Sequence, residues 1–387
     1  MSSTSCPQVS IYHSILWSKY KGVVFSEVYS QSTNRGVDMS FIQVAETEVQ
    51  RVAMAGVDLS YHQYPYRLLF QGSYENVPLI RRVVALSRDV IKNPVDLVVL
   101  PNYNRVEYWV MLFVCMIIGR KRAVVCDSTF YDRPRPFWRE LAKRIFFRNC
   151  NGYFCYGIRS KEYLLSYGVD ELKVKFRRQA AALPPDYSVP AVLKNYENYQ
   201  ADSRAPHFLY LGRFSKEKGL LDLLMAFKLV LQQRPQAKLS LIGAGDMKAA
   251  LVDRIQSLGL GSAVTFLGSM TLEKVAPLFM RSAAMVLPSH SEPWGLVVNE
   301  SLSYGCPVVV SDVCGCVPEL VHDGVTGYSF PCGDVAALSV AMLAAADMSA
   351  DRLAAAKRCL DAISTYTPEN SATQMLDGCI EILAASP

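Results

Sequence analysis

The chain has 387 residues, of which 51% are hydrophobic and 19% charged, and its formal net charge is +5. This length is enough for two or three domains, and the apolar content excludes a disordered chain. The longest apolar run, Tyr108 to Gly119, is shorter than the roughly 20 residues of a membrane-spanning helix, so we expect a buried helix there. The N-terminus, MSSTSCPQVSIYH, has no secretion signal, and we expect a cytoplasmic protein.

Cysteines and histidines are too scattered to indicate a structural framework. The eleven cysteines include no C-x-x-C pair, and several lie inside apolar runs, where a thiol behaves as a small hydrophobic group. The five histidines show no spacing typical of metal ligands. We therefore predict neither disulfides nor a metal site.

Short β-branched runs alternate with segments of helical period, which is typical of parallel sheets covered by helices. In the first half, helices are predicted at Pro78 to Ile91, Arg105 to Ile118 and Phe137 to Phe147. The predicted strands there are Val9 to Tyr12, Phe41 to Val44, Leu97 to Leu100, Ala123 to Cys126 and Gly152 to Tyr156. The pattern predicts a doubly wound α/β domain over residues 1–185.

The alternation lapses between Ala181 and His207, a proline-containing polar stretch that predicts a linker. A second series of strands is then predicted at Phe208 to Leu211, Lys238 to Ile242, Val264 to Leu267, Ala284 to Leu287 and Pro307 to Ser311. We expect a second doubly wound domain over residues 206–365.

The second domain opens with FLYLGRFSKEKGLLDLLMAF, which places Arg213 and Lys218 in the loop between a strand and a helix that begins near Gly219. Open α/β sheets bind ligands beyond the carboxyl ends of their strands, and a helix N-terminus there favours an anion. Two cations at this point suit a diphosphate. The alternative is that both are solvated surface charges.

A second glycine turn, LSLIGAGD, contains Gly243 and Gly245. G-x-G is also an ordinary turn, and the full dinucleotide pattern G-x-G-x-x-G is absent. The segment does not predict NAD binding.

The segment PSHSEPWGLVVNE places Glu292 in a loop after a buried strand and Glu300 on the following helix. The two carboxylates are about two helical turns apart and can face one crevice. Paired acceptors beside a cationic phosphate site fit a sugar and a ribose that flank a diphosphate. The alternative is that Glu300 is exposed and Glu292 caps the helix.

The run of GRFSKEKG, IGAGD, VTFLG and SHSEPWGLVVNESLSYGCPVVVSDVCGCVPELVHDGVTGYSF closely resembles family four of the retaining glycosyltransferases. The resemblance covers the C-terminal half in order. It implies the GT-B fold, with two Rossmann-like doubly wound domains facing a central cleft. It also accords with a C-terminal crossover helix at about residues 366–387 that returns to the first domain.

The resemblance assigns roles to the motif residues. Arg213 and Lys218 would bind the donor diphosphate, Glu292 the donor sugar and Glu300 the nucleotide ribose. Backbone amides from Trp294 to Val297 would reach the sugar or phosphates. The other residues placed on the donor side are Gly22, Gly243, Phe266, Gly268, Gly295 and Leu296.

The first half matches the family less well. The stretch HSILWSKYKGVVF has the single Gly22 after Lys21, where the family usually has a glycine pair near the diphosphate and acceptor. A histidine often follows a mid-domain strand in the family, but this chain has Cys126 and Asp127 there. We expect Asp127 to supply that contact to the donor sugar, unless another residue does, and Lys21 to lie on the acceptor or phosphate side.

The resemblance also implies a mechanism. The sugar would be attacked on the face from which the diphosphate departs, and the leaving phosphate oxygen would take the acceptor proton. Glu292 would orient sugar hydroxyls rather than act as a nucleophile. Arg213, Lys218 and helix N-termini would neutralise the leaving group, so neither a metal nor another cofactor is expected.

Basic residues concentrate in one region. Between Gly119 and Ala180 there are fifteen basic and six acidic residues, a surplus of +9, which leaves −4 for the rest of the chain. Within residues 133–148, Arg139, Lys143 and Arg144 alternate with aromatic and aliphatic side chains, which favours a peripheral contact with anionic lipid at the inner face of the membrane. The alternative is a solvated basic face with its aromatic residues in the core.

These observations and the resemblance together predict a retaining, metal-independent glycosyltransferase. It would move a sugar from a nucleotide-sugar to a glycan, with a lipid-linked one expected, in cell-surface polysaccharide or glycolipid synthesis. A small-molecule glycosyltransferase and a catalytically silent sugar-nucleotide-binding scaffold remain as alternatives. Nucleic acid is not expected as a partner, because no nucleic-acid-binding motif accompanies the basic segment.

Overall fold

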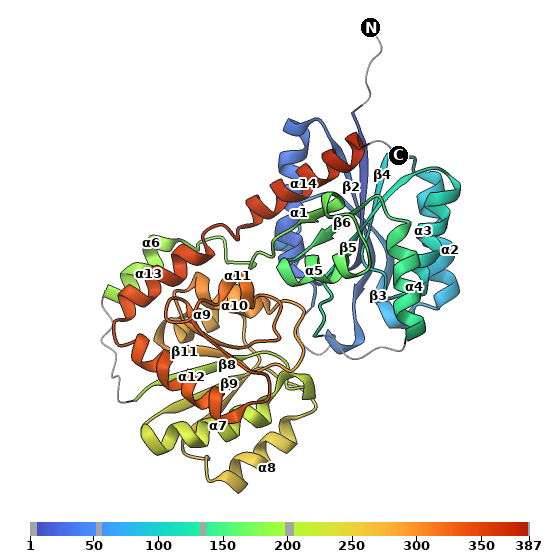
Figure 1. Cartoon of the computed structure of the whole chain (residues 1–387). Coiled ribbons are helices and arrows are strands. Elements are labelled where there is room, and N and C mark those ends of the chain that lie inside the picture. The colour runs from blue at the N-terminus through green and yellow to red at the C-terminus, as the bar shows by residue number, and fades with distance from the viewer. Residues whose placement is uncertain (1–5, 52–55, 132–136, 198–204, 386–387) are drawn as a thin grey trace. The chain divides into compact units, whose positions relative to one another are not determined.

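The computed structural model describes residues 6–51, 56–131, 137–197 and 205–385, and the chain divides into two compact units (Figure 1). The N-terminal unit contains residues 1–129, 134–182 and 367–387. The C-terminal unit contains residues 130–133 and 183–366. Each unit is built around one parallel sheet.

The sheet of the N-terminal unit has seven strands in the order β3-β2-β1-β4-β5-β6-β7. The strands are β1 (Gln8–Ile15), β2 (Asp38–Thr47), β3 (Tyr66–Ser73), β4 (Leu97–Leu100), β5 (Lys121–Cys126), β6 (Gly152–Cys155) and β7 (Val174–Phe176). The order reverses between β1 and β4, which creates a crevice at their carboxyl ends of the kind that binds ligands in such sheets.

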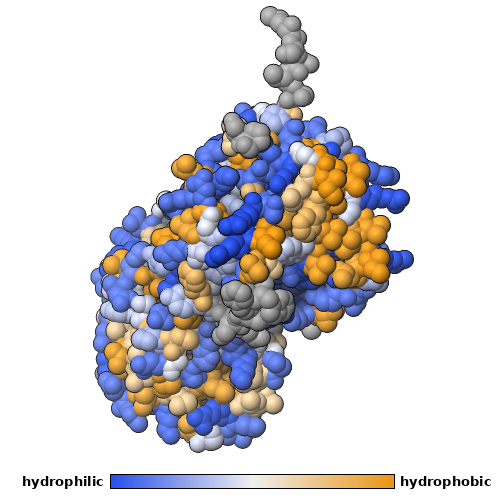
Figure 2. Space-filling model, turned by 45° about the vertical axis from the view of Figure 1, so that its right-hand side comes forward, coloured by the Kyte–Doolittle hydropathy of each residue, from blue (hydrophilic) through white to orange (hydrophobic). Residues whose placement is uncertain are grey.

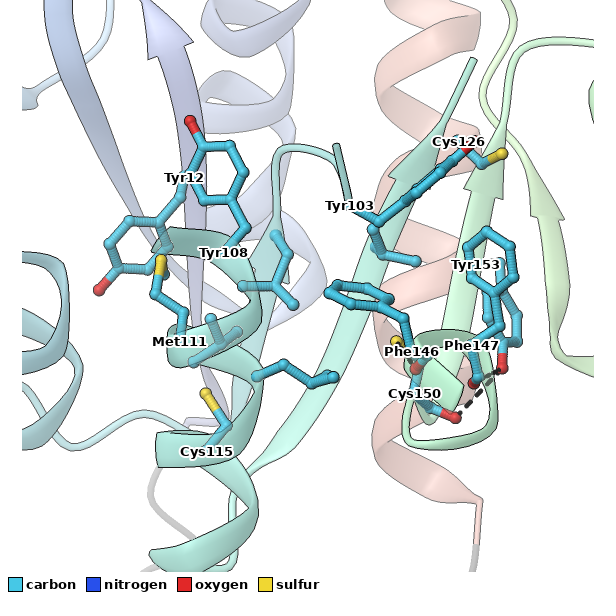
Figure 3. Close-up of a cluster of buried hydrophobic side chains, with 14 of the residues drawn as sticks. Tyr12, Tyr103, Tyr108, Met111, Cys115, Cys126, Phe146, Phe147, Cys150 and Tyr153 are labelled. Carbon is cyan, nitrogen blue, oxygen red and sulfur yellow. Dashed lines mark hydrogen bonds between the residues drawn. The ribbon is translucent and has the colours of Figure 1, made fainter. Parts of the chain in front are cut away.

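Helices cover both faces of this sheet because its central strands are buried on both sides. They are α1 (Lys19–Ser32), α2 (Leu79–Lys92), α3 (Val106–Ile117), α4 (Phe137–Arg148), α5 (Ile158–Ser166) and α14 (Pro368–Ala384). Figure 3 shows part of the core, in which Tyr108 and Met111 of α3 and Phe146 and Phe147 of α4 belong to one cluster of buried side chains. Six of the eleven free cysteines lie in this unit, and five of them are buried: Cys115, Cys126, Cys150, Cys155 and Cys379.

The last helix, α14, packs beside the first helix, α1 (Figure 1). Gln31 of α1 accepts a hydrogen bond from Thr373 Oγ1 at 2.9 Å, and Arg35 forms an ion pair with Asp377. At the end of α14, Lys121 Nζ donates to the carbonyl oxygens of Ile382 and Leu383 at 3.1 and 2.7 Å. Residues from both ends of the described chain therefore complete one unit.

The sheet of the C-terminal unit has six strands in the order β10-β9-β8-β11-β12-β13, so its order reverses between β8 and β11. The strands are β8 (His207–Leu211), β9 (Lys238–Ile242), β10 (Val264–Gly268), β11 (Ala284–Leu287), β12 (Val308–Ser311) and β13 (Gly327–Phe330). The helices are α6 (Val189–Glu197), α7 (Leu220–Gln233), α8 (Lys248–Leu258), α9 (Leu272–Arg281), α10 (Leu296–Ser303), α11 (Val317–Leu320), α12 (Val335–Met348) and α13 (Arg352–Ile363).

The structure confirms the predicted α/β class and every predicted strand, and it adds three strands that the sequence did not predict: β3, β7 and β13. All three are edge strands, which bury less apolar surface and carry a weaker pattern. The predicted linker contains a helix that the sequence did not predict, α6. Tyr196 of α6 is buried and donates to the carbonyl oxygen of Tyr304 at 2.8 Å, and this packing explains the helix.

Candidate functional site

The loops that follow β8 and β11 pack tightly against each other at the reversal of the C-terminal sheet. Gly219, which precedes α7, has φ +65°, and a Cβ there would lie 2.0 Å from the carbonyl oxygen of Pro288. The N–H of His290 donates to the carbonyl oxygen of Glu217 at 2.8 Å. His290 Nε2 also lies 2.6 Å from Asp222 Oδ2 of α7. The two loops therefore form one rigid surface at the carboxyl ends of the central strands.

Lys218 and Glu292 form an ion pair across these loops, with 13% and 16% of their side chains exposed. Arg213 is 46% exposed, and its Nη2 lies 3.4 Å from Glu217 Oε1. The alternative of solvated charges thus fits Arg213 in part, but it is wrong for Lys218. The structure brings a cation expected at the diphosphate into contact with the carboxylate expected at the sugar.

The loop of Glu292 is held by its backbone. Its carbonyl oxygen accepts from Gly315 N–H at 3.0 Å, and the carbonyl oxygen of Trp294 accepts from Cys316 N–H at 3.0 Å. Gly295, with φ +99°, is the N-cap of α10, and no side chain caps this helix. The alternative in which Glu292 caps the helix is therefore wrong.

The first turn of α10 presents backbone donors beside this loop. Leu296 and Val297 are its first two residues, and the first N–H groups of an α-helix have no acceptor within the helix. Trp294 is buried, and its Nε1 donates to Asn299 Oδ1 at 2.8 Å. These amides belong to a well-packed element, which suits them to hold an anion.

Glu300 lies on α10 and is partly buried rather than exposed, so the alternative that treats it as a surface residue is wrong. Burial raises the pKa of its carboxyl group to about 7. A carboxyl group that changes its ionisation near neutral pH can accept hydrogen bonds from hydroxyl groups in its charged form.

The glycine turn after β9 serves the packing of neighbouring loops. A Cβ on Gly243 would lie 1.9 Å from the carbonyl oxygen of Gly212, and its N–H donates to Gly268 O at 2.9 Å. Phe266, on β10, is partly buried, and its ring centroid is 5.8 Å from that of Phe214. The three segments expected on the donor side are thus joined by direct contacts.

The predicted residues of the first half lie in the N-terminal unit, where a pocket of about 170 Å³ is lined by Lys21 and Asp127. Lys21 is 4% exposed, and its Nζ donates to the Tyr156 hydroxyl at 2.8 Å. Burial, and secondly the charge of Arg177, place the pKa of Lys21 well below its usual value, while Asp127 acts in the opposite direction.

Gly22 has a packing role in this unit. A Cβ there would lie 2.7 Å from the carbonyl oxygen of Tyr61, the last residue of the short 3-10 helix η3 (Leu59–Tyr61). A glycine at this position lets α1 approach η3 closely.

Sequence reasoning missed Arg177, Tyr156, Tyr20 and His13, which also line this pocket. His13 Nδ1 lies 2.8 Å from the carbonyl oxygen of Ile15, and burial followed by the charge of Lys21 lowers the pKa of its imidazole to about 3. Their positions in the sequence could have indicated them, because polar residues that directly follow parallel strands meet at one edge of the sheet. Arg177 follows an edge strand that was not predicted.

The described residues contain neither a cluster of metal-ligand side chains nor a helix that could span a membrane. In residues 6–51, 56–131, 137–197 and 205–385, no group of three or more His, Cys, Asp or Glu side chains could hold a metal ion. Over the same part of the chain, no helix is both long and apolar enough to cross a bilayer.

Comparison with known proteins agrees with this geometry. Residues 194–358 match the family model of the glycosyl transferases group 1. The C-terminal unit belongs to this family. Over 152 residues the chain is 36% identical to a glycogen synthase of Mycobacterium tuberculosis, and over 175 residues it is 28% identical to the N-acetyl-alpha-D-glucosaminyl L-malate synthase of Bacillus anthracis. These matches span 39% and 45% of this chain, and 36% and 42% of those proteins.

Solved structures resemble this chain over nearly its whole length. A glycosyltransferase of Rickettsia africae has a TM-score of 0.72 at 17% identity, covering 98% of this chain and 99% of that one. Anabaena Alr3699/HepE, solved with UDP and glucose, has a TM-score of 0.71 at 16% identity, covering 97% and 99%. The chain therefore has two Rossmann-like α/β units of the GT-B class.

Proposed function

We propose that the chain is a retaining glycosyltransferase that transfers a sugar from a nucleotide-sugar to a lipid-linked glycan acceptor, without a metal ion. The observation that carries this proposal is the Lys218–Glu292 ion pair at the reversal of the C-terminal sheet. It joins a phosphate-binding cation to a hydroxyl-binding carboxylate, as a sugar diphosphate requires. The structural neighbour solved with UDP and glucose makes a UDP-sugar the first donor to test.

In the proposed site, Lys218, Arg213 and the first-turn amides of α10 bind the diphosphate, and Glu292 binds the sugar hydroxyls. Glu300 accepts from the ribose, and the segment that contains Phe266 and Gly268 lies against the base. These roles use electrostatic stabilisation of the leaving group, which a preorganised site supplies without reorganisation during the reaction.

The proposed reaction conserves the configuration at the anomeric carbon. The bond from that carbon to the diphosphate oxygen breaks, and the acceptor oxygen bonds to the same face. The leaving phosphate oxygen takes the proton of the acceptor hydroxyl. Glu292 orients the sugar and forms no bond to it, and Asp127 is proposed as a further contact to the donor sugar.

We also propose that the N-terminal unit contacts anionic lipid, through a larger surface than residues 133–148. Residues 133–136 and the side chains of Phe137 and Trp138 lie outside the described part. The expectation that Phe146, Phe147 and Lys143 face lipid is wrong, because all three are buried, and Lys143 pairs with Glu140 at 2.6 Å. The core alternative therefore holds for these residues (Figure 3).

An apolar surface nearby supports the lipid proposal. The apolar run expected as a buried helix is α3, but Ile117 is 83% exposed, and Ile80 of the adjacent α2 is 76% exposed. Figure 2 shows apolar side chains gathered on the right-hand face of the N-terminal unit. Exposed residues on these helices and α4 include Ile80, Arg81, Val84, Arg88, Ile91, Phe113, Ile117, Leu141, Arg144 and Ile145.

The donor is tested by measuring the melting temperature of the chain with UDP-, GDP- and ADP-sugars, because a bound donor raises it. Release of nucleoside diphosphate is then measured for the wild type and for Glu292→Gln. We expect one donor to stabilise the wild type, and the variant to turn over more slowly. Binding without any release of nucleoside diphosphate would instead identify a silent scaffold.

A further inference from the structure

Arg177 is a buried cation without a hydrogen-bond acceptor. It directly follows β7, its backbone N–H donates to Cys155 O at 2.8 Å, and its residue is 1% exposed. Its Nε, Nη1 and Nη2 atoms have no acceptor among the residues that the structure describes. Burying a guanidinium group without a partner is costly, and most buried polar groups in proteins are hydrogen-bonded. The arrangement therefore needs an explanation beyond folding.

A second buried cation lies beside the first. Lys21 Nζ is 4.7 Å from the ring centroid of Tyr156, and the Arg177 guanidinium is 5.7 Å from the same centroid. Phe25 flanks Arg177, with its centroid at 5.8 Å. Burial is the main cause of the lowered pKa of Lys21, and the like charge of Arg177 lowers it further. Aromatic faces stabilise these cations in part, but they leave the N–H donors of Arg177 unused.

Both cations line the pocket of about 170 Å³ described above. Its acidic side chains are Glu48 and Asp127, and Glu48 is paired with Arg51 at 3.2 Å and lies 3.7 Å from Arg105. The basic lining residues, Lys21, Arg51 and Arg177, therefore outnumber the acidic ones. The volume equals that of roughly six water molecules, which is enough for a small anionic group and too little for a nucleotide.

We propose that Lys21 and Arg177 form a binding site for one anionic group, a phosphate or a carboxylate, on the acceptor. Arg177 matches the planar or tetrahedral oxygens of such a group with several N–H donors, and Lys21 adds a second charge. The C-terminal unit already supplies Arg213 and Lys218 for the donor diphosphate, so the N-terminal pair is assigned to the other substrate. This assignment to the acceptor rests on the function proposed above.

The anion site is tested by melting the full chain with and without millimolar inorganic phosphate. The proteins are the wild type, Arg177→Met, Lys21→Met and the control Arg148→Met, which removes an exposed arginine of the same unit. We expect phosphate to stabilise the wild type and the control equally, and its affinity to fall at least about tenfold in the other two variants. Lys21→Met keeps the test decisive if Arg177→Met does not fold.

The unliganded proteins give an independent readout. Without phosphate, Arg177→Met should melt no lower than the wild type, because the variant removes an unpaired buried charge. A purely structural arginine would instead be needed for stability, and its loss would lower the melting temperature. The proposal is overturned if phosphate does not stabilise the wild type, or if Arg177→Met keeps the full phosphate response.

Binding of UDP separates the two sources of the anion. If Arg177→Met loses phosphate binding but keeps the UDP affinity of the wild type, the anion belongs to the acceptor. If UDP affinity falls in parallel, the anion is the donor diphosphate, and the acceptor assignment is wrong. If the wild type binds phosphate through Lys21 and Arg177 but binds no nucleotide or nucleotide-sugar, the proposed function fails while the anion site stands.

Discussion

Lys218 and Glu292 neutralise each other from two different loops, although each is expected to contact a different part of one substrate. Their side chains are mostly buried, so each charge depends on the other in the unliganded protein. A donor would insert its diphosphate and sugar hydroxyls next to this pair. The same two side chains are therefore expected both to stabilise the loops and to bind the donor.

Removing one member of the pair should affect both properties. For Lys218→Met we expect the free energy of unfolding to fall by about 1–3 kcal/mol, because Glu292 loses a charged partner. We expect turnover to fall by about 100-fold, since the leaving diphosphate loses a cation. Chemical denaturation and release of nucleoside diphosphate measure the two effects. Lys216→Met, an exposed lysine two residues earlier, is the matched control and should change neither.

Glu300 should make stability depend on pH. The pKa of its carboxyl group is raised to about 7 in the folded protein, from an ordinary value of 4.5. Between these values the folded protein binds the proton and the unfolded chain does not, so stability falls as pH rises. Relative to Glu300→Gln, the wild type should lose up to about 3 kcal/mol between pH 4.5 and 7, and nothing more above pH 8. A stability difference between the two proteins that stays constant from pH 4.5 to 8 would instead show that the pKa of Glu300 is not raised in the folded protein.

Gly219 should tolerate no side chain. An added Cβ would collide with the carbonyl oxygen of Pro288, and the residue has a positive φ angle. Gly219→Ala should therefore lower the melting temperature and weaken donor binding, because it forces the two loops of the site apart. Gly259, with φ +71° and no atom within 4 Å of its added Cβ, provides the control. Gly259→Ala should cost only about 1 kcal/mol and leave donor binding unchanged.

The apolar surface of α2, α3 and α4 should bind anionic vesicles. Ile117→Asp places a negative charge in this surface, and we expect it to reduce co-sedimentation with vesicles of anionic lipid, as added salt also should. Leu172→Asp is the control, since Leu172 is 80% exposed on another segment of the same unit. Equal losses in both variants, or no binding by the wild type at low salt, would contradict the proposed lipid contact.

The sequence predicts the central strands well because they are short apolar runs buried on both faces. It does not predict β7, whose three residues include Lys175, and so it does not place Arg177 at a sheet edge beside Tyr156 and Lys21. The donor-side residues were recognisable because their motifs are continuous in sequence. The anion pocket could not be recognised in this way, because its residues come from the ends of several strands and are brought together only by folding.

Many of the basic residues between Gly119 and Ala180 have hydrogen-bond or ion-pair partners, which the net charge of +9 does not reveal. Arg120 donates to Val95 O at 2.8 Å, Lys121 caps the end of α14, and Lys161 pairs with Glu171 at 2.5 Å. The surplus reflects the need to satisfy carbonyl groups and carboxylates at strand and helix ends. Only part of it remains for a lipid surface.

The packing of α14 on α1 has a consequence for biosynthesis. The ribosome synthesises α1 early. It synthesises α14, which packs on α1 and accepts hydrogen bonds from Lys121, only after the whole C-terminal unit. The C-terminal unit can fold while the N-terminal one still exposes apolar surface to chaperones. Truncation before Pro368 should therefore give a chain whose N-terminal half aggregates, even though every residue of the donor motifs is present.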